Sequence, residues 1–568
     1  MDELDDYIMH KPVHVVPSSF QLDPEIDLTL LSLGTKFIPT SRPSDGRDVD
    51  VDAVHTFSEH PRLMNEFQRQ ASEAERQEVA TTLLRALERD TACLPNLTAT
   101  QRCTLRRLSR DTSLVILNAD KNLGLTVMTR QWYEEQIFKH LHDVTTYRPI
   151  NDWNTQLKRI NALLIRIGRQ PWPPRPPIRT RNPKTRTNAA TIASSSAPCR
   201  FYIIPKVHKT PPSSRPIAAA CNYVTTPLSR RVTPYLQTMV NRLPEVVKNS
   251  TVFLRMLSKI PQPLPANALL FAADVESLYP NIETQWAMQL LTPPIHATFG
   301  DRNGSTLCYA LHVVLTNLFV RYREHTFHQT SGCAMGTPLA PPYANLTMHY
   351  ADLHVREEFA ACLALLARYI DDYVGIWTGT EAEFKSFTTK MNALHPRIKI
   401  VFSTLSRSIS FLDILISIED GRITTKLFRK ALNRYLYIPP TSQHHNATLR
   451  GWIRGEGIRI ARTCSTKAAF QAELVFFRSL LRERGYKAKM ITHALSQVNY
   501  ERVRGTLLAA SQVSTRQDDG NSAIYLIPRY HPGTHASIRR ALTSTRTPNA
   551  RLAWKVAPSI GAILGKHR

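Results

Sequence analysis

The tetrapeptide Tyr369-Ile370-Asp371-Asp372 places two adjacent carboxylates between two apolar runs, residues 363–367 and 373–377. Carboxylates in such surroundings are costly to bury unless an opposite charge lies beside them. A divalent cation can supply that charge, because Mg²⁺ takes oxygen ligands from one or two carboxylates together with substrate phosphates. The flanks have the length and composition of short strands, which predicts a hairpin with the acidic pair at its tip. An ordinary solvated turn is the alternative for an Asp-Asp pair taken alone.

A third carboxylate, Asp274, follows the apolar run 268–273, which predicts a buried strand ending at this residue. Two-metal phosphoryl transfer needs carboxylates from separate segments to hold two ions about 4 Å apart. Asp274 could also cap a helix, since a helical pattern follows at residues 283–291. Asp274, Asp371 and Asp372 are therefore candidate ligands of two divalent ions.

A loop rich in glycine and proline, residues 331–341, lies between the acidic segments and precedes a helical run at 343–353. Glycine allows a ligand to approach the backbone closely, and the amide groups at a helix N-terminus favour phosphate. Gly336 and Pro338 are therefore candidates for nucleotide binding. Taken singly, such a loop is more often an ordinary connection that precedes a helix and binds no ligand.

In this order, Asp274, the Gly336-Thr337-Pro338 loop and the Tyr369–Asp372 box resemble the palm motifs of reverse transcriptases. Residues 201–209 and 214–217 are similar to the fingers motifs of that family. The resemblance implies that Lys206, Lys209 and Arg215 bind the triphosphate of an incoming dNTP, a task that suits a guanidinium fork and compact ammonium charges. It implies that Asp274, Asp371 and Asp372 are catalytic and bind two Mg²⁺ ions, for which Mn²⁺ could substitute, with the Val275 carbonyl as a further ligand. It also implies that Tyr279, five residues after Asp274, is an aromatic steric gate against ribose.

The resemblance narrows to the reverse transcriptases of Penelope-like retroelements. It is carried by Asn118–Gly124, by Pro205–Lys209 and by Met335, where many relatives outside the group have Gln. It extends over roughly residues 15–560. The implied protein is a nuclear RNA-directed DNA polymerase with an RNA template, a DNA primer and dNTPs as partners. Its implied fold is α+β, a right-hand polymerase with fingers, an antiparallel palm sheet, a helical thumb and a helical N-terminal extension.

Members of this group typically carry a GIY-YIG nuclease after the polymerase, and no such motif follows here. We therefore expect an endonuclease-lacking or truncated form. Members without the nuclease are associated with priming at free DNA ends, which the resemblance implies for this chain too.

Composition and pattern divide the chain into seven parts. We expect an acidic segment (1–60), a mostly helical extension (61–170), a linker rich in proline and basic residues (171–200), fingers (201–267), a palm (268–420), a basic helical thumb (421–500) and a basic C-terminal extension (501–568). The thumb is expected to bind template–primer phosphates through Arg429, Lys430, Arg459 and Arg462.

The charge distribution favours a polyanionic partner. The chain has a net charge of +26, yet residues 1–60 hold 12 acidic and 4 basic side chains, a net of −8, so the remainder carries +34. Surplus positive charge of that size favours nucleic acid, with affinity that depends on salt. No apolar run is long enough to span a membrane, and the acidic N-terminus is unlike a secretion signal.

Two other classes of function stay open. One is another templated polymerase, either telomerase-like or a viral RNA polymerase. The other is a catalytically retired derivative that binds nucleic acid, although the three intact carboxylates count against it. The oligomeric state is not predicted.

Overall fold

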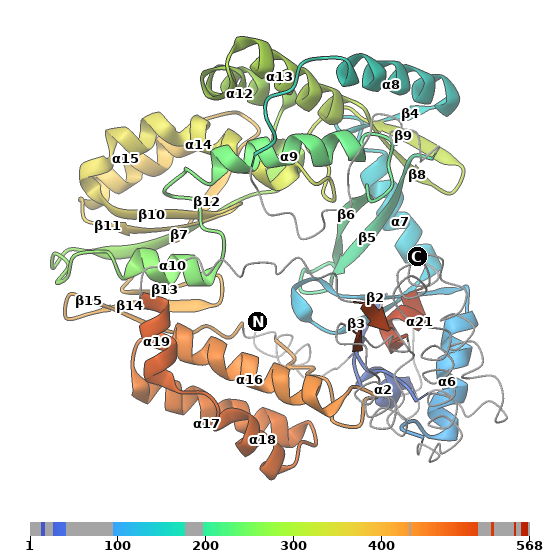
Figure 1. Ribbon diagram of the computed structural model, residues 1–568, viewed down its shortest axis with the longest axis vertical. Helices are drawn as coiled ribbons and strands as arrows, with labels where there is room; N and C mark the ends of the chain where they lie inside the picture. The colour runs from blue at the N-terminus through green and yellow to red at the C-terminus, as the bar shows by residue number, and fades with distance from the viewer. Residues whose placement is uncertain are drawn as a thin grey trace.

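The computed structural model describes residues 13–16, 27–40, 95–176, 197–430, 433–508, 524–526, 550–552 and 558–565. Most of the acidic segment, residues 61–94, much of the linker and most of the C-terminal extension therefore lie outside the described residues. Helices and sheets are mixed throughout the described part (Figure 1).

A central antiparallel sheet with strand order β10-β11-β7-β12 lies between two layers (Figure 1). Alternate side chains of its strands enter two different cores: Phe271, Tyr373 and Trp377 pack on one face, and Leu270 and Val374 on the other. Because both faces are covered, the strands read as continuous apolar runs. The strands are β7 (Leu269–Val275), β10 (Leu363–Tyr369), β11 (Asp372–Trp377) and β12 (Ile400–Phe402). The predicted strand before Asp274 and the predicted hairpin are confirmed.

Helices α14 (Ala340–Glu358) and α15 (Glu381–Asn392) cover the first face, with η3 (Ala360–Cys362) beside them. The second face packs against α10 (Ser250–Leu257) and a three-stranded antiparallel sheet. That sheet consists of β13 (Ser408–Phe411), β14 (Ile414–Glu419) and β15 (Arg422–Leu427).

A five-stranded sheet with order β4-β9-β8-β5-β6 shares the first core. Its strands are β4 (Tyr147–Ile150), β5 (Cys199–Lys206), β6 (Ser213–Ala219), β8 (Leu318–Tyr322) and β9 (His325–Gln329). The same core includes helices α7 (Arg130–Leu141), α8 (Trp153–Gly168), α9 (Thr226–Val240), α11 (Leu278–Asn281), α12 (Thr284–Phe299) and α13 (Asp301–Thr316).

The described N-terminal part forms a small sheet, β1-β3-β2, with its own core. It contains β1 (Val13–Val16), α2 (Asp27–Leu31), α6 (Ala99–Arg110), β2 (Leu114–Asn118), η1 (Asp120–Asn122), β3 (Leu125–Thr129) and the distant helix α21 (Ile560–Leu564). The extension was expected to be mostly helical; its described part contains helices α6, α7 and α8 and also strands at residues 114–118 and 125–129. Short runs of leucine and β-branched side chains on both sides of a turn favour strands.

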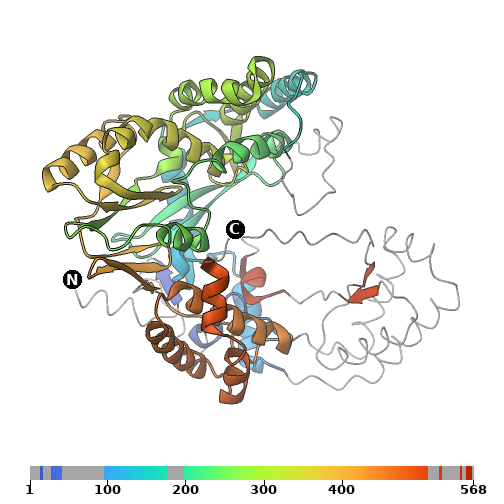
Figure 2. The same cartoon turned by 60° about the vertical axis from the view of Figure 1, so that its left-hand side comes forward.

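Four further helices form what we call the helical module, residues 433–508: α16 (Asn446–Thr463), α17 (Lys467–Glu483), α18 (Ala488–Leu495) and α19 (Tyr500–Leu508). It lies below the central sheet and the β13–β15 sheet in both views (Figures 1 and 2). The segment from residue 421 was expected to be helical, but it begins with β15, and the helices start at Asn446. Strands β16 (Ile524–Leu526) and β17 (Ala550–Leu552) pair in parallel.

The N-terminal segment 27–40 is bonded to the helical module and to α21. The Ile38 amide donates to Ser442 Oγ at 2.8 Å, and the Gln443 amide donates to the Ile38 carbonyl at 3.0 Å. The Ile560 amide donates to the carbonyl of Phe37 at 2.9 Å.

Among the described helices, none combines the length and apolarity that a membrane crossing requires.

Candidate catalytic site

The three predicted carboxylates meet at one edge of the central sheet. Asp372 is the direct cross-strand partner of Asp274, and Asp371 lies in the β10–β11 turn beside them. The amide of Val275 donates to the Asp371 carbonyl at 3.0 Å, which ties the turn to β7. Ile370 makes the tight turn possible with a φ of 59°. The hairpin therefore delivers two carboxylates to a third that is 97 residues away in the chain.

Burial disfavours ionisation of all three carboxyl groups, and the charge of Asp371 adds to this effect at Asp274 and Asp372. Burial and the charge of Asp371 raise the pKa of Asp274, and burial also raises the pKa of Asp371. Burial, together with the charges of Asp371 and Asp274, raises the pKa of Asp372 to about 6. A hydrogen bond between the carboxyl groups of Asp274 and Asp372 adds to this shift. Like charges gathered in this way need a cation or a shared proton to relieve them.

The donor set suits a hard divalent cation. All three side chains offer carboxylate oxygens, and their mutual repulsion is what a bound cation would remove. Within the described ranges, no group of three His, Cys, Asp or Glu side chains is already arranged to hold an ion by itself. Mg²⁺ commonly binds through one or two carboxylates and completes its shell with substrate phosphates and water. The residues fit that kind of site.

The fully buried Arg368 is hydrogen-bonded to the turn that carries Asp371 and Asp372. Arg368 donates from Nη1 to the Ile370 carbonyl at 3.0 Å and to Asn345 Oδ1 at 2.9 Å, and from Nη2 to the Asn345 carbonyl at 2.8 Å. Its guanidinium lies 3.9 Å from the carboxylate of Glu245. Its backbone also bonds the segment at residues 245–247. Arg368 was not among the residues predicted from the sequence, although it directly precedes the acidic box.

The network continues into α14 through charged and polar groups. Arg356 Nε contacts Asp352 Oδ1 at 2.7 Å, and the Tyr373 hydroxyl donates to Asp352 Oδ2 at 2.8 Å. His349 Nδ1 lies 2.6 Å from the carboxylate of Glu245. Burial raises the pKa of Asp352 even though two arginines oppose that shift. The hairpin thus packs against paired buried charges as well as against an apolar core.

Four cations lie together on the β5–β6 hairpin and η1, and we call them the basic cluster (Lys121, Lys206, Lys209 and Arg215). Arg215 on β6 favours the charged form of Asp371, and Lys121 favours that of Asp274. Lys206 at the end of β5 has a lowered pKa because of burial and the charge of Arg215. The three fingers residues predicted to bind triphosphate are therefore brought together.

Lys121 and Asp120 are the functional candidates that sequence reasoning missed. They lie in η1, which packs against β5, and Asp120 Oδ2 is 3.2 Å from Arg215 Nη2. Lys121 is exposed and has a φ of 59°, in the left-handed region. A signal was available, because the Asn118–Gly124 segment carried part of the family resemblance.

Tyr279 lies on α11, close to Asp371. Burial and the neighbouring charges of Cys333 and Asp371 raise the pKa of Tyr279 above its usual range. Its carbonyl accepts the Cys333 amide at 2.7 Å, which joins α11 to the glycine-rich loop. The ring is partly buried against the first core.

Gly336 is exposed and has a φ of 119°, and a Cβ there would lie 2.3 Å from the Ala218 carbonyl oxygen. The close approach expected of this glycine is therefore made to β6, the strand that carries Arg215. Half-buried Pro338 follows in the same loop, and the Leu339 amide next to it donates to Ser229 Oγ at 3.2 Å. Backbone contact with a nucleotide at Gly336 or Pro338 stays a prediction.

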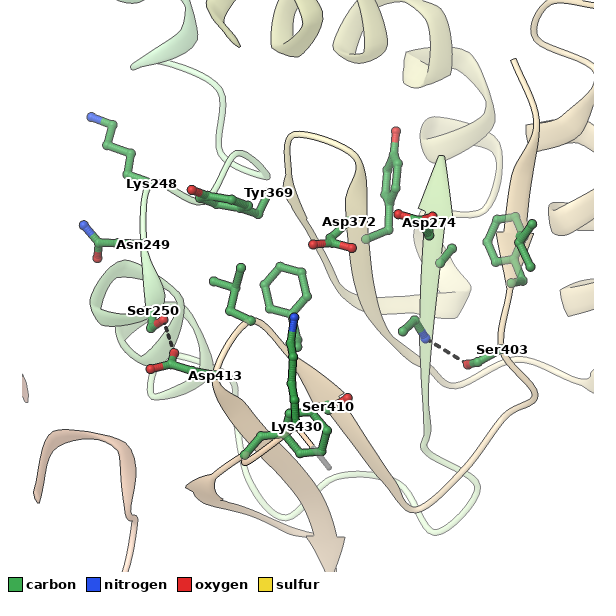
Figure 3. A pocket seen from close by; sticks show the side chains of 18 residues that line it. Lys248, Asn249, Ser250, Asp274, Tyr369, Asp372, Ser403, Ser410, Asp413 and Lys430 are labelled. Atoms are coloured by element: carbon green, nitrogen blue, oxygen red, sulfur yellow. Dashed lines mark hydrogen bonds between the residues drawn. The ribbon is translucent and has the colours of Figure 1, made fainter. Parts of the chain in front are cut away.

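An open pocket of about 870 Å³ extends from Asp274 and Asp372 toward α10 and the β13–β14 turn. Figure 3 shows the two carboxylates side by side, with Lys430 pointing toward Asp372. Ser250 donates to Asp413, and Asp413 in turn pairs with Arg459. We call this the carboxylate pocket.

The four residues expected to bind template and primer occupy different environments. Lys430 lines the carboxylate pocket. Arg429 is paired with Glu473 at 2.9 Å, and Arg459 is paired with Asp413 and Glu456. Arg462 donates to Thr251 Oγ1 at 3.3 Å and lines a separate pocket. Their contact with nucleic acid stays a prediction.

Comparison with known proteins gives one family match and several structural similarities. Residues 436–496, which include α16 to α18, match the model of the animal helix-turn-helix domain. No curated protein matches the sequence.

Three solved structures illustrate the structural similarity. Telomerase from Candida albicans, in complex with a TWJ fragment of telomeric RNA, is 12% identical; the match covers 82% of this chain and 71% of that one, with a TM-score of 0.48. Apo telomerase from Candida tropicalis is 10% identical over 89% and 87% of the chains, with a TM-score of 0.41. The RNA polymerase complex inside a dsRNA virus is 13% identical over 80% and 42%, with a TM-score of 0.35. The family match describes part of the helical module, while the carboxylate site is characterised by its own geometry.

Proposed function

We propose that this chain is a templated nucleotidyltransferase, an RNA-directed DNA polymerase of the Penelope-like group, which extends a DNA primer with dNTPs in the nucleus. The observation that carries the proposal is the meeting of Asp274 with Asp371 and Asp372, between the basic cluster on one side and the carboxylate pocket on the other. Three carboxylates opposite several cations suit a substrate that is a metal-bound polyphosphate.

In the proposed reaction, the primer 3′-oxygen attacks the α-phosphorus of the dNTP and the bond to the bridging oxygen of pyrophosphate breaks. Asp274, Asp371 and Asp372, with the Val275 carbonyl, would hold two Mg²⁺ ions. When bound, these ions would lower the pKa of the 3′-hydroxyl and offset charge on the pyrophosphate.

The basic cluster would bind the β- and γ-phosphates. Arg215 can present a planar fork to phosphate oxygens, and its ion pair with Asp120 limits the directions in which that fork can point. Lys206 and Lys209 would add compact charges from the end of β5. The carboxylate pocket would receive the primer terminus, with Lys430 near its last phosphates.

Tyr279 would select the sugar. Its position on α11 near Asp371 supports a role beside the nucleotide, where its ring would exclude a ribose 2′-hydroxyl. A Tyr279→Ala variant is expected to incorporate rNTPs on the same template while dNTP incorporation continues. Exclusion of rNTPs as complete as in the parent would remove Tyr279 from this role.

The decisive experiment is extension of a labelled DNA primer on an RNA template with Mg²⁺ and either dNTPs or rNTPs. The parent is expected to extend with dNTPs. The double variant Asp371→Asn/Asp372→Asn is expected to lose several orders of magnitude in rate, because charge stabilisation by the bound ions would be lost. Glu381→Gln, an exposed change at the start of α15, is the matched control and should extend as the parent does.

The second candidate is a nucleic-acid-binding protein without polymerase activity. The match of residues 436–496 to a helix-turn-helix model favours nucleic-acid contact by the helical module whether or not the carboxylates are active. Tight, salt-sensitive binding of duplex by a parent that never extends the primer would select this candidate. Extension that also starts from blunt DNA ends would support the proposed priming at free ends.

A further inference from the structure

Helix α11, which carries Tyr279, is only four residues long, and the residue before it, Ser277, has a φ of 49°. A single helical turn is not stable by itself in water, so contacts with other segments fix its position. The last carbonyls of a helix have no donor within the helix. The carbonyls of Tyr279 and Pro280 are therefore points at which other segments can bind α11.

Both carbonyls accept hydrogen bonds from outside α11. The Cys333 amide donates to the Tyr279 carbonyl at 2.7 Å, and Arg397 Nη2 donates to the Pro280 carbonyl at 3.2 Å. The other arm of the guanidinium, Nη1, donates to Ser331 Oγ at 2.6 Å. Arg397 thus joins α11 to the glycine-rich loop that already bonds Tyr279.

The loop and α11 also touch through their backbones. A Cβ at Gly332 would lie 2.6 Å from the carbonyl oxygen of Pro280, the same oxygen that accepts from Arg397. Because the guanidinium is a rigid fork, its two bonds restrict the direction in which the Pro280 carbonyl can point. The side chain of the preceding residue, Tyr279, moves with that peptide.

Arg397 lies in a segment, residues 395–399, that contacts α11 and both of its flanks. His395 Nε2 lies 3.3 Å from Glu283 Oε2, after α11, and Lys399 Nζ lies 3.4 Å from Glu276 Oε2, before it. The Arg397 amide donates to His395 Nδ1 at 3.2 Å. Alternate residues of this segment therefore bind before, within and after α11, and Arg397 is the one in the middle.

The Tyr279 ring lies near the catalytic carboxylates. Burial raises the pKa of its phenol, and the nearby charge of Asp371 adds to this shift. Ribose and deoxyribose differ by one oxygen atom, so a ring that separates them has to be held accurately. A displacement of about 1 Å can change a rate by about 100-fold.

We propose that Arg397 is a positioning residue, which holds the Tyr279 ring, through the Pro280 carbonyl, where it distinguishes deoxyribose from ribose. This inference rests on the proposed function for the role of Tyr279. It adds a residue that touches neither the sugar nor the metal ions.

The first test compares kcat/KM for dNTP and rNTP incorporation on one RNA template and DNA primer. Arg397→Gln removes the guanidinium, and we expect its selectivity for dNTPs over rNTPs to fall by about tenfold or more, chiefly through faster rNTP incorporation. Damage to the fold alone would lower both incorporations together and leave the ratio unchanged. Arg302→Gln, at an exposed site on α13, is the matched control and should keep the parental selectivity.

A double-mutant cycle tests whether Arg397 acts through Tyr279. In Tyr279→Ala the ring is absent, so adding Arg397→Gln should not lower the selectivity further. A further loss as large as that of Arg397→Gln alone would overturn the proposal, as would parental selectivity in that single variant. Ser331→Ala removes the other acceptor of the guanidinium and should lower the selectivity in the same direction with a smaller change to the protein.

A measurement without catalysis separates this proposal from the proposed function. Fluorotyrosine introduced in place of Tyr279 alone reports the surroundings of the ring by fluorine NMR. Its resonance is expected to shift in Arg397→Gln and in Ser331→Ala, and to stay in place in Arg302→Gln. A resonance that stays in place in all three would overturn the proposal even if the parent extends a primer. A shifted resonance in a protein that never extends a primer would refute the polymerase and leave Arg397 as the residue that positions Tyr279.

Discussion

Arg368 shows how one buried side chain can determine the geometry of a site that it does not enter. Its guanidinium donates a hydrogen bond to the carbonyl of Ile370, the residue whose left-handed conformation forms the turn of the hairpin. The next two residues are the carboxylates. Because the arginine is completely buried, its fork has a single arrangement relative to Asn345 and Glu245. We infer that the position of Asp371 depends on this contact.

Arg368→Lys keeps the charge and loses the fork, so the acidic turn should shift while the fold persists. We expect kcat for primer extension to fall by about 100-fold, because small misplacements of reacting groups cost that much, with dNTP KM nearly unchanged. Arg368→Met leaves buried carboxylates uncompensated and should reduce the free energy of unfolding by about 3–5 kcal/mol.

Steady-state extension and urea unfolding measure the two effects. Arg321→Lys, at an exposed site on β8, is the control and should match the parent in both measurements. A kcat equal to that of the parent in Arg368→Lys would show that the turn keeps its geometry without the guanidinium.

At this scale the sequence predicts the residues that carry distinctive chemistry and misses those that position them. Asp274, Asp371 and Asp372 were predictable as a group because carboxylates in apolar strands are costly to bury unless an opposite charge, such as a shared cation, lies beside them. Arg368 looks like any basic residue beside a motif. Its burial is decided by Asn345 and Glu245, which no local pattern links to it.

The turn η1 is an element whose backbone presents a cation. Leu123 and Ala119 at its ends are buried in the main core, and the Ala119 amide donates to the Gly124 carbonyl at 2.8 Å. Lys121 between them is exposed with a φ of 59°, a conformation that costs a non-glycine residue about 1–3 kcal/mol. The turn thus holds a strained lysine on the side that faces Asp274.

Two substitutions separate the charge of Lys121 from its backbone conformation. Lys121→Ala and Lys121→Gly both remove the charge, and we expect both to raise dNTP KM by about tenfold with a small change in kcat. Glycine accepts positive φ, so the glycine variant should be at least as stable as the alanine variant.

Extension kinetics and thermal melting test this pair of variants. Lys158→Ala, at an exposed site on α8, is the control for loss of one positive charge. Unchanged KM in both Lys121 variants would exclude the lysine from nucleotide binding.

Element predictions succeeded where both faces of a strand or one face of a helix are covered, as in β7, β11 and α14. They failed at residue 422, where strand β15 replaces the expected helix, and they did not separate strands β2 and β3 from the helices of the N-terminal extension. There the runs are short. The partner of β15 is β14, the strand just before it across the Asp420-Gly421 turn, whereas the N-terminal sheet also includes β1 from a distant segment.

Across the whole molecule, the N-terminal segment joins parts that are far apart in the chain. Arg484, the residue that caps the C-terminus of α17, donates to the carbonyls of Ser32 and Leu33 at 3.0 Å each, and to the Tyr437 carbonyl at 2.7 Å. Asn96 donates to the Thr441 carbonyl at 2.9 Å. No sequence pattern pairs these residues, since their contacts involve backbone carbonyls that every residue has.

Arg484→Ala should loosen the helical module from the N-terminal segment, because three carbonyls lose a charged donor. We expect the free energy of unfolding to fall by about 1–3 kcal/mol. The rate of dissociation from duplex should rise, because the module is tethered at fewer points.

Urea unfolding and a dissociation assay with competitor duplex measure the two effects of Arg484→Ala. Arg482→Ala removes an exposed arginine from the same helix and should change stability little. Equal unfolding midpoints for the two variants would contradict the role given to Arg484.

The packing of α21 against the N-terminal segment also constrains how the protein is made. Ile560 and Leu564 are buried in the same core as Leu30, Leu31 and Phe37. That core cannot be completed on the ribosome until the segment around residue 560 has emerged. At about 5–20 residues per second, the intervening chain takes on the order of a minute to synthesise. During that time the apolar side chains of Leu30, Leu31 and Phe37 lack their final partners, so we expect the yield of folded protein to depend on translation speed and on chaperones that shield them.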